Sequence, residues 1–442
     1  MKYGLNSKVK LFILGIAIFF YSNAFSKTLY HYVLVGPNNA LIIRTITDNN
    51  SCPLLTIDNK KTAMQMRVPL DTVEKKSQQS YFPVSVCELT LPSPHHKVSL
   101  NNQAIPLLKI KINKISVIGD TGCRLKAPHS FQACDNLNAW PLSTISHAIS
   151  RDNPDVIIHV GDYLYRESKC KQKDCKNSPF GYNWNSWNED VFKPMKELMS
   201  VSPLILIRGN HESCQRAGEG WFRFFDPYPY DPLLACIDRQ QQVTDKPYSI
   251  ILNSNIQIIV FDSAETTNKS IAVKTDLTHH FQDVGQMLIP SYRHWMLLHH
   301  PAFGMTYINK LGWVGGIRST YDPLLAVGSS ERFLSQFDLW IQGHIHTFEL
   351  IDYQQSFMPL NIISGMGGTE LEDKFPSIPK QFEVEKDIFI KNINYSEHYG
   401  YLNLQVNHSK GTVTLKDTHG KTYNICNLDF NNKTFSCIQD KL

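Results

Sequence analysis

The sequence predicts an α/β core that follows a smaller all-β segment. From about residue 112, apolar runs of strand length alternate with stretches whose apolar residues have helical spacing. Buried strands that alternate with helices in this way are typical of an α/β fold. Before residue 112, short runs rich in β-branched and aromatic residues are cut by Pro, Asn and Asp, as in antiparallel strands joined by turns. We therefore expect a β domain over residues 27–111 and an α/β domain over residues 112–442.

Each predicted element has its own run of residues. In the first domain we expect strands at 30–35, 41–43, 81–84 and 98–100. In the second domain we expect strands at 115–118, 156–160, 204–207, 256–261, 295–298, 339–341 and 361–363, with helices at 138–151 and 189–199. Alternating residues at 401–406 and 412–415 predict a return to strands near the end of the chain.

Composition and charge exclude several classes of protein. The 442 residues include 42% apolar and 19% charged residues, which is ordinary for a globular chain and excludes collagen-like and wholly disordered proteins. Of the 44 Lys and Arg residues, Lys2, Lys8 and Lys10 lie in the first 26 positions, and the remaining 41 nearly balance the 40 Asp and Glu residues. Because proteins that bind nucleic acid carry a clear basic excess, we expect no nucleic-acid partner.

The first 26 residues resemble a secretory signal peptide. Three lysines precede an apolar stretch over residues 11–21, and small residues stand at Ala24 and Ser26, where a signal peptidase reads the chain. The alternative is a membrane anchor, but the apolar stretch is short for a span. We therefore expect a secreted or periplasmic protein that keeps no stable membrane span after cleavage.

Ten cysteines follow the leader, and they fall into five pairs that are close in sequence. Exported proteins keep disulfides, so we expect five local bridges: Cys52–Cys87, Cys123–Cys134, Cys170–Cys175, Cys214–Cys236 and Cys426–Cys437. Sequence alone does not fix disulfide connectivity. A zinc site made of cysteines is disfavoured, because the chain lacks two Cys-x-x-Cys pairs.

Polar motifs follow five of the predicted core strands. They are Gly-Asp-Thr-Gly at 119–122, Gly-Asp-Tyr-Leu-Tyr at 161–165, Gly-Asn-His-Glu at 209–212, His-His-Pro at 299–301 and Gly-His-Ile-His at 343–346. In an open α/β fold, side chains just past the carboxyl ends of strands converge on one crevice. Carboxylate and amide oxygens together with imidazole nitrogens are suitable ligands for a pair of metal ions.

These five motifs, in this order, resemble those of the calcineurin-like metallophosphoesterases, and most of all those of the purple acid phosphatases. The motifs run from Asp120 to His346, which is about half of the chain. Two positions indicate the subfamily: Gly122 stands where many relatives have a ligand His, and Tyr165 stands where a purple acid phosphatase supplies a tyrosinate. The alternative for Tyr165 is a packed aromatic side chain. The resemblance implies a four-layer core of two mixed sheets flanked by helices.

The resemblance also implies the role of each site residue. The first ion, iron(III), is expected on Asp120, Asp162, Tyr165 and His346. The second ion, a divalent iron, zinc or manganese, is expected on Asp162, Asn210, His299 and His344, with Asp162 as the bridge. His300 is the alternative to His299. His211 is expected to protonate the leaving group or to bind a phosphate oxygen.

The expected function is that of a secreted acid phosphatase that hydrolyses small phosphate monoesters. Two cations about 3.5–4 Å apart would clamp the phosphate and ready a hydroxide for in-line attack, and a positioned His would supply a proton. A phosphodiesterase or a nucleotide pyrophosphatase on the same fold is the nearest alternative, and a non-catalytic secreted binding protein is an alternative of another class. The sequence does not indicate the oligomeric state or the organic part of the substrate.

Overall fold

The computed structural model describes residues 27–72, 80–92, 96–127, 131–253, 255–266, 270–308, 312–315, 330–372, 375–376, 378–379, 381–407 and 409–439. The predicted signal peptide over residues 1–26 lies outside these residues. Among the residues that are described, no helix has both the length and the apolar character needed to cross a bilayer.

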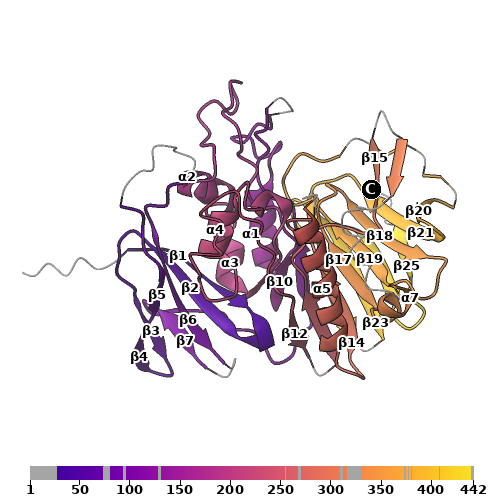
Figure 1. Cartoon of the computed structure of the whole chain (residues 1–442), viewed down its shortest axis with the longest axis horizontal. Coiled ribbons are helices and arrows are strands. Elements are labelled where there is room, and N and C mark those ends of the chain that lie inside the picture. Colours follow the sequence, from indigo (N-terminus) through magenta and orange to yellow (C-terminus); the bar gives the residue numbers. More distant parts are fainter. Residues whose placement is uncertain are drawn as a thin grey trace, which may run out of the picture.

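Two large sheets form the centre of the described molecule (Figure 1). The larger contains eleven described strands in the order β25-β24-β23-β22-β9-β10-β11-β1-β2-β6-β5. The second contains eight described strands in the order β12-β13-β14-β17-β19-β18-β21-β20. In the first sheet the parallel strands are β9 (Ile115–Ile118), β10 (Val156–His159), β11 (Leu204–Leu206) and β1 (Thr28–Val35). In the second sheet they are β13 (Ile256–Val260), β14 (Arg293–Leu297), β17 (Leu339–Gln342) and β19 (Leu360–Ser364).

Antiparallel strands extend both sheets. The larger sheet continues into β2 (Leu41–Thr47), β6 (Ser85–Leu91) and β5 (Gln65–Val68) on one side, and into β22 (Gly400–Asn407), β23 (Lys410–Asp417), β24 (Thr422–Asp429) and β25 (Thr434–Gln439) on the other. The second sheet adds β12 (Tyr248–Leu252), β18 (Phe348–Tyr353), β21 (Ile388–Ser396) and β20 (Glu383–Glu385). A separate pair consists of β15 (Met305–Ile308) and β16 (Gly312–Gly315).

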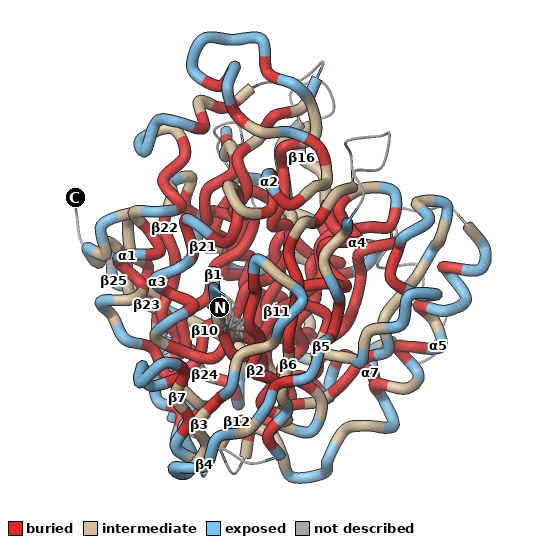
Figure 2. The backbone as a smooth tube through the Cα atoms, turned by 90° about the vertical axis from the view of Figure 1, so that its left-hand side faces the viewer, coloured by how far each residue is buried: buried red, intermediate tan, exposed pale blue. Residues whose placement is uncertain are grey.

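The core strands are almost entirely buried and mostly apolar because both faces of each sheet are covered. In β10, Val156 and Ile158 point into the core between the sheets, whereas Ile157 packs with the helices on the outside. In β17, Leu339 lies between the sheets and Trp340 packs against the outer helices. In Figure 2, most residues of this interior are coloured as buried. The predicted four-layer fold is therefore confirmed.

Helices form the two outer layers. The outer face of the larger sheet is covered by α1 (Leu142–Asp152), α2 (Trp184–Trp187), α3 (Lys196–Val201) and α4 (Gly218–Phe224). The outer face of the second sheet is covered by α5 (Ile271–Met287) and α7 (Ser330–Ser335). The helix predicted over 189–199 is interrupted, because a π-helical turn at Asn188–Phe192 precedes α3.

The N-terminal segment is rich in strands, as predicted, but its strands do not all form a sheet of their own. Four of them (β1, β2, β5 and β6) extend the larger sheet, and β1 pairs directly with β11. The others, β3 (Leu54–Ile57), β4 (Lys60–Ala63), β7 (Val98–Leu100) and β8 (Gln103–Ala104), form a small separate sheet. The predicted strand at 81–84 is wrong: these residues precede β6, and Pro83 has no N–H to give to a ladder. The domain boundary at residue 111 stays a prediction.

Two buried arginines of the N-terminal strands hold the end of helix α4. Arg44 donates to the carbonyl of Phe224 at 2.6 Å, and Arg67 donates to the carbonyl of Phe222 at 2.8 Å. Glu88 pairs with both guanidinium groups, at 3.3 and 3.0 Å. The last carbonyls of a helix lack partners inside the helix, and cations are favourable there. The N-terminal segment therefore stabilises the helix that follows the Gly-Asn-His-Glu motif.

The five disulfides pair as predicted, between the neighbouring cysteines of the sequence: Cys52–Cys87, Cys123–Cys134, Cys170–Cys175, Cys214–Cys236 and Cys426–Cys437. No cysteine among the described residues is left free. Disulfides of this number are typical of proteins that fold outside the cytosol.

A buried glutamate in β18 predicts a pH dependence of stability. Burial raises the pKa of Glu349 to about 8, and its carboxyl group accepts from the Met305 N–H at 3.1 Å. The unfolded chain releases this proton near pH 4.5, whereas the folded protein keeps it, so folded-state stability is lost as the pH rises from about 4.5 to 8. Glu349→Gln should remove that loss, which is on the order of 3–5 kcal/mol across the window. Urea unfolding at pH 5 and pH 8.5 measures it.

The matched control is Glu331→Gln, because Glu331 lies exposed on α7. The control should lose stability with pH as the wild type does. If the free energy of unfolding falls with pH equally in the wild type and in Glu349→Gln, Glu349 is ionised in the folded protein.

Candidate metal centre

The five polar motifs come together at one end of the two sheets. Asp120 follows β9, Asp162 follows β10, and Asn210 follows β11, and these three strands are neighbours in the larger sheet. His299 follows β14 and His344 follows β17, which are parallel neighbours in the second sheet. The site therefore lies where the carboxyl ends of both sheets meet, and each sheet contributes side chains from adjacent strands.

One group of ligand atoms surrounds the hydroxyl of Tyr165. Its Oη lies 3.1 Å from Oδ1 of Asp120, 2.9 Å from Oδ2 of Asp162 and 3.1 Å from Nε2 of His346. The His346 nitrogen is also 3.6 Å from Asp120 Oδ1. Three oxygens and one imidazole nitrogen thus lie together within the buried interior.

A second group of ligand atoms surrounds the side-chain oxygen of Asn210. His299 Nε2 lies 3.1 Å from Asn210 Oδ1 and 3.2 Å from Asp162 Oδ2, and His344 Nδ1 lies 2.9 Å from Asn210 Oδ1. Asp162 Oδ2 therefore touches members of both groups. All seven predicted ligands are brought together, and Asp162 stands between the two groups.

The surrounding backbone fixes the orientation of two imidazoles. Nδ1 of His299 lies 2.8 Å from the carbonyl of Val160, and Nδ1 of His346 lies 2.8 Å from the carbonyl of Glu370. A carbonyl accepts only, so Nδ1 carries a proton in each ring and Nε2 is the nitrogen that faces the cluster. This arrangement is typical of histidines that bind metal ions.

Three of the predicted ligands stand on left-handed backbone. The φ angles are 53° at Asp120, 57° at Asp162 and 72° at His344. This conformation is uncommon for residues other than glycine, although Asp tolerates it better than most. Strained backbone of this kind gathers at functional sites, where the rest of the fold enforces it.

Two glycines make room for the cluster. A side chain at Gly209 would clash with the carboxylate of Asp162. A Cβ at Gly122 would lie 2.6 Å from the carbonyl of Tyr163 and 2.8 Å from the ring of Tyr165. Tyr165 thus fills the space beside residue 122, so a residue larger than glycine there and a tyrosine at 165 exclude each other.

His211 lies at the edge of the cluster. Its ring packs on that of Tyr165, with centroids 3.7 Å apart, and its Nε2 is 3.9 Å from Asp162 Oδ2. Its Nδ1 is 3.0 Å from Oε1 of Glu167. Arg216 Nη2 lies 2.8 Å from His211 Nε2 and pairs with Glu167. A proton carried by this imidazole therefore has a carboxylate beside it.

Sequence reasoning missed three side chains that organise the site. Glu167 and Arg216 contact His211 as described, and neither belongs to a quoted motif. Glu212 was quoted within a motif but given no role: its carboxyl oxygens accept from the N–H groups of Tyr163, at 2.9 Å, and of Gly209, at 3.3 Å. Glu212 thus joins the loops after β10 and β11. Its position beside His211 is the one signal that could have indicated it.

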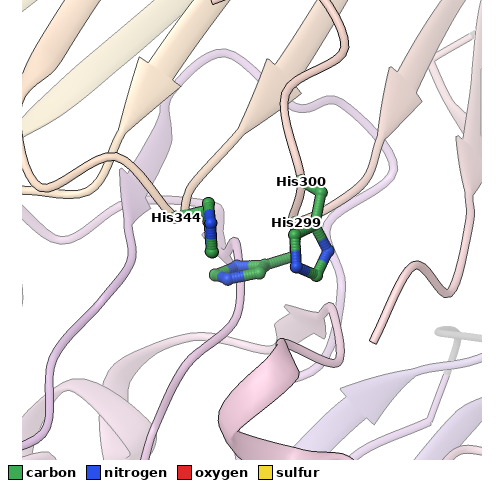
Figure 3. A group of neighbouring side chains, drawn as sticks. All are labelled: His299, His300 and His344. Atoms are coloured by element: carbon green, nitrogen blue, oxygen red, sulfur yellow. The ribbon is translucent and has the colours of Figure 1, made fainter. Parts of the chain in front are cut away.

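His300 forms a buried histidine group with two predicted ligands. Figure 3 shows His299 and His300 on one loop, with His344 facing them from the loop after β17. One nitrogen of each lies within 4.8 Å of the others. Nδ1 of His300 is 3.1 Å from Ser263 Oγ, and its Nε2 has no hydrogen-bond partner in the described part of the chain. His299 is the one that contacts both Asp162 and Asn210, but the choice between the two histidines stays a prediction.

Burial and the neighbouring charges shift the pKa values of the cluster residues in different directions. Burial raises the pKa of Asp120 well above its ordinary value. Burial acts the same way on Asp162, but His299 and His211 outweigh it and hold the pKa of Asp162 well below its usual range. Burial and the neighbouring His299 lower the pKa of His344 to about 3. Burial lowers the pKa of His299, but the carboxylate of Asp162 outweighs burial and raises it to about 9. Buried carboxylates and imidazoles together are a donor set that fits metal ions.

Other residues noted in the sequence lie outside the cluster. Trp221 is buried on α4 among the aromatic residues that pack beneath the larger sheet, so it belongs to the core. Arg208 pairs with Asp262 at 3.0 Å and contacts none of the seven predicted ligands. The glycine loop after β19 supports the first motif instead: the N–H of Thr369 donates to the carbonyl of Asp120 at 3.0 Å.

Comparisons with known proteins agree with this architecture. Residues 114–348, more than half of the chain, match the family model described as calcineurin-like phosphoesterase. One component of the nuclease SbcCD of Staphylococcus saprophyticus is 23% identical over 334 residues, which cover 66% of this chain and 80% of that protein.

Two solved structures have a similar fold. Purple acid phosphatase PPD1 from seeds of yellow lupin (Lupinus luteus) aligns with a TM-score of 0.60 and 13% identity, covering 91% of this chain and 74% of the lupin chain. PhoD aligns with a TM-score of 0.57 and 9% identity, covering 95% of this chain and 93% of the PhoD chain.

Two sheets between helical layers, with carboxylates and imidazoles at their shared carboxyl edge, define a metallophosphoesterase. The match over residues 114–348 identifies the family. The chain belongs to the calcineurin-like phosphoesterases. That family's fold implies metal ions at this site and hydrolysis of phosphate esters.

Proposed function

We propose that the protein is an exported acid phosphatase that hydrolyses phosphate monoesters with two metal ions. The observation that carries this proposal is the position of Tyr165, whose hydroxyl lies within 3.1 Å of atoms of Asp120, Asp162 and His346. A phenol at the centre of such a donor set is suited to iron(III). The five disulfides and the signal-like leader support export.

Each of the two groups of ligand atoms would hold one ion. Asp120, Asp162, Tyr165 and His346 would hold iron(III), and Asp162, Asn210, His299 and His344 would hold a divalent iron, zinc or manganese. Bound there, the two cations would neutralise the phosphate, clamp its oxygens and lower the pKa of the water that attacks phosphorus.

His211 supplies the proton for the leaving oxygen in this proposal. Its Nε2 lies at the edge of the cluster, and Glu167 faces its Nδ1 at 3.0 Å. Glu167 and the carbonyl of Leu164 fix the ring through Nδ1. Burial and Arg216 lower the pKa of His211, so a proton on this imidazole passes readily to the departing alkoxide. Arg216, which lies against the same ring, would bind a phosphate oxygen.

The visible absorption spectrum and the metal content of purified protein test the proposal. Wild-type protein should contain two metal ions per chain, including iron, and should show a tyrosinate–iron(III) absorption band. Tyr165→Phe should abolish the band. The matched control is Tyr163→Phe, because Tyr163 is also buried but stacks on His159 with centroids 4.0 Å apart, away from the ligand atoms. The control should keep the band.

The outcomes separate the parts of the proposal. A band that survives in Tyr165→Phe would remove the tyrosine from the metal site. Colourless, iron-free protein that still cleaves monoesters would reject iron while leaving the phosphatase activity in place. Metal-free wild-type protein without activity would favour a non-catalytic binding protein.

A phosphodiesterase is the second candidate, because the relative at 23% identity is part of a nuclease. A paired assay with p-nitrophenyl phosphate and bis-p-nitrophenyl phosphate distinguishes the two activities. We expect the monoester to be the better substrate, and a higher kcat/KM for the diester would reverse the assignment.

A further inference from the structure

Cationic side chains gather beside the metal centre. Arg124 Nε lies 3.9 Å from Glu370 Oε2, and the carbonyl of Glu370 is the group that orients His346. Lys126 Nζ lies 3.9 Å from Glu167 Oε2. Arg216 pairs with the same Glu167 carboxylate. Three cations thus share two carboxylates, and each carboxylate belongs to a residue that contacts a predicted ligand or His211.

A lysine-rich loop continues this surface outward. The loop leaves the core where the Ser168 N–H donates to the carbonyl of Leu125 at 2.8 Å, and it returns where the Gly181 N–H donates to the carbonyl of Arg166 at 2.7 Å. Its start therefore lies directly beside Arg124 and Lys126. The loop belongs to the segment between β10 and α2 (Figure 1), and it carries four exposed lysines: Lys169, Lys171, Lys173 and Lys176.

A disulfide holds these lysines in a compact loop. Cys170 and Cys175 are buried and bonded to each other, so the lysines between and beside them stay close together. We define the cationic rim as Arg124, Lys126, Arg216 and the four loop lysines. Glu370 and Glu167 lie against the first three cations, Asp174 belongs to the loop itself, and Asp162 of the metal centre also attracts Lys126 and Arg216.

The rim is a local feature of a chain that is otherwise close to neutral. Beyond the leader, 41 Lys and Arg residues face 40 Asp and Glu residues, so the rim's excess is balanced by an excess of acids elsewhere. A concentrated positive patch beside a site raises the local concentration of anionic substrates. A long polyanion such as nucleic acid would extend beyond this patch, where the remaining chain offers no basic excess.

We propose that the cationic rim binds a second anionic group of the substrate, so that the preferred substrates are small esters with at least two phosphate groups. This inference rests on the proposed phosphatase function. One phosphate is held at the metal centre, where Arg216 also reaches it, and the other is held by the remaining residues of the rim. Arg124 and Lys126 make the nearer contacts, and the loop lysines add longer-range attraction that salt screens.

A matched pair of substrates tests the rim: fructose 6-phosphate and fructose 1,6-bisphosphate. At low ionic strength we expect kcat/KM to be about tenfold higher for the bisphosphate, beyond the twofold statistical advantage of its two phosphates. The advantage should shrink toward that statistical factor in 0.5 M salt, since the Debye length falls to a few ångströms, about 3 Å at 1 M.

A quadruple variant with Lys169, Lys171, Lys173 and Lys176 all changed to Ala should lower kcat/KM for the bisphosphate by about fivefold and leave the monophosphate nearly unchanged. The control has the same change of net charge at four exposed lysines outside the rim, Lys60, Lys61, Lys97 and Lys111. The control should keep the bisphosphate preference.

Each of three results would overturn the inference. The first is a bisphosphate-to-monophosphate ratio of kcat/KM that stays near the statistical factor at every salt concentration. The second is identical behaviour of the quadruple variant and its control, and the third is stronger inhibition by a 20-nucleotide oligonucleotide than by the bisphosphate at equal phosphate concentration. If p-nitrophenyl phosphate and both sugar phosphates are left intact, the phosphatase function itself fails. The rim is then judged by calorimetric binding of fructose 1,6-bisphosphate, which the quadruple variant should weaken and the control should not.

Discussion

Replacing Asp162 by asparagine should lower kcat/KM for a phosphate monoester by about 10³–10⁴-fold, or ~4–5.5 kcal/mol of transition-state stabilisation. The reason is its position: Oδ2 lies 2.9 Å from Tyr165 Oη and 3.2 Å from His299 Nε2, so this one carboxylate contacts both groups of ligand atoms. An amide supplies one oxygen without charge and cannot bridge two cations equally. Steady-state kinetics, with metal analysis of the same samples, measures the effect, and both ions should be depleted.

The control is Asp352→Asn, the same chemical change at another buried aspartate. Asp352 lies in β18 and accepts from Asn392 Nδ2 at 3.0 Å, away from the cluster. It should keep its metal content and its activity. Full activity and full metal content in Asp162→Asn would falsify the assignment of the cluster as the metal centre.

Replacing His211 by asparagine should lower kcat by about 10²–10⁴-fold for an alkyl phosphate and much less for p-nitrophenyl phosphate. An alkoxide needs a proton as it departs, whereas p-nitrophenolate is stable without one. Because His211 contacts the cluster only at its edge, metal content should stay at the wild-type level. The ratio of the two rate losses separates proton transfer from phosphate binding, which would affect both substrates alike.

His280→Asn serves as the control, since His280 is buried on α5 and its ring packs against Phe261 in the outer layer of the second sheet. It should leave both rates unchanged. Equal losses for alkyl and aryl substrates in His211→Asn would instead assign His211 to binding a phosphate oxygen, the other role that the sequence allowed.

The sequence predicted the fold well where physical constraints are local. Runs such as 156–160 and 339–341 are apolar at nearly every position, because a strand covered on both faces has no solvent side. The order of polar motifs after such runs placed seven side chains at the ends of five strands, and the structure brings all seven together. The cysteine pairs were found because each pair is close in sequence.

Other features depend on contacts between distant residues, which no local pattern records. The pairing of β1 with β11 joins Leu34 to Leu204, and nothing in either run indicates the partner. Glu167 and Arg216 meet at His211 only after the loops fold. The segment at 81–84 has the composition of a strand, but it is held by loop contacts such as that of the Phe82 N–H with Asp71 Oδ2 at 2.8 Å.

The placement of β1 between β11 and β2 has a consequence for dissecting the molecule. A polypeptide starting at residue 112 would leave β11 as a bare edge with unpaired amides, and α4 would lose the guanidinium groups that bind its final carbonyls. Amide hydrogen exchange should therefore report one cooperative opening for β1, β2 and β11, and attempts to express the hydrolytic half alone should yield aggregation-prone material.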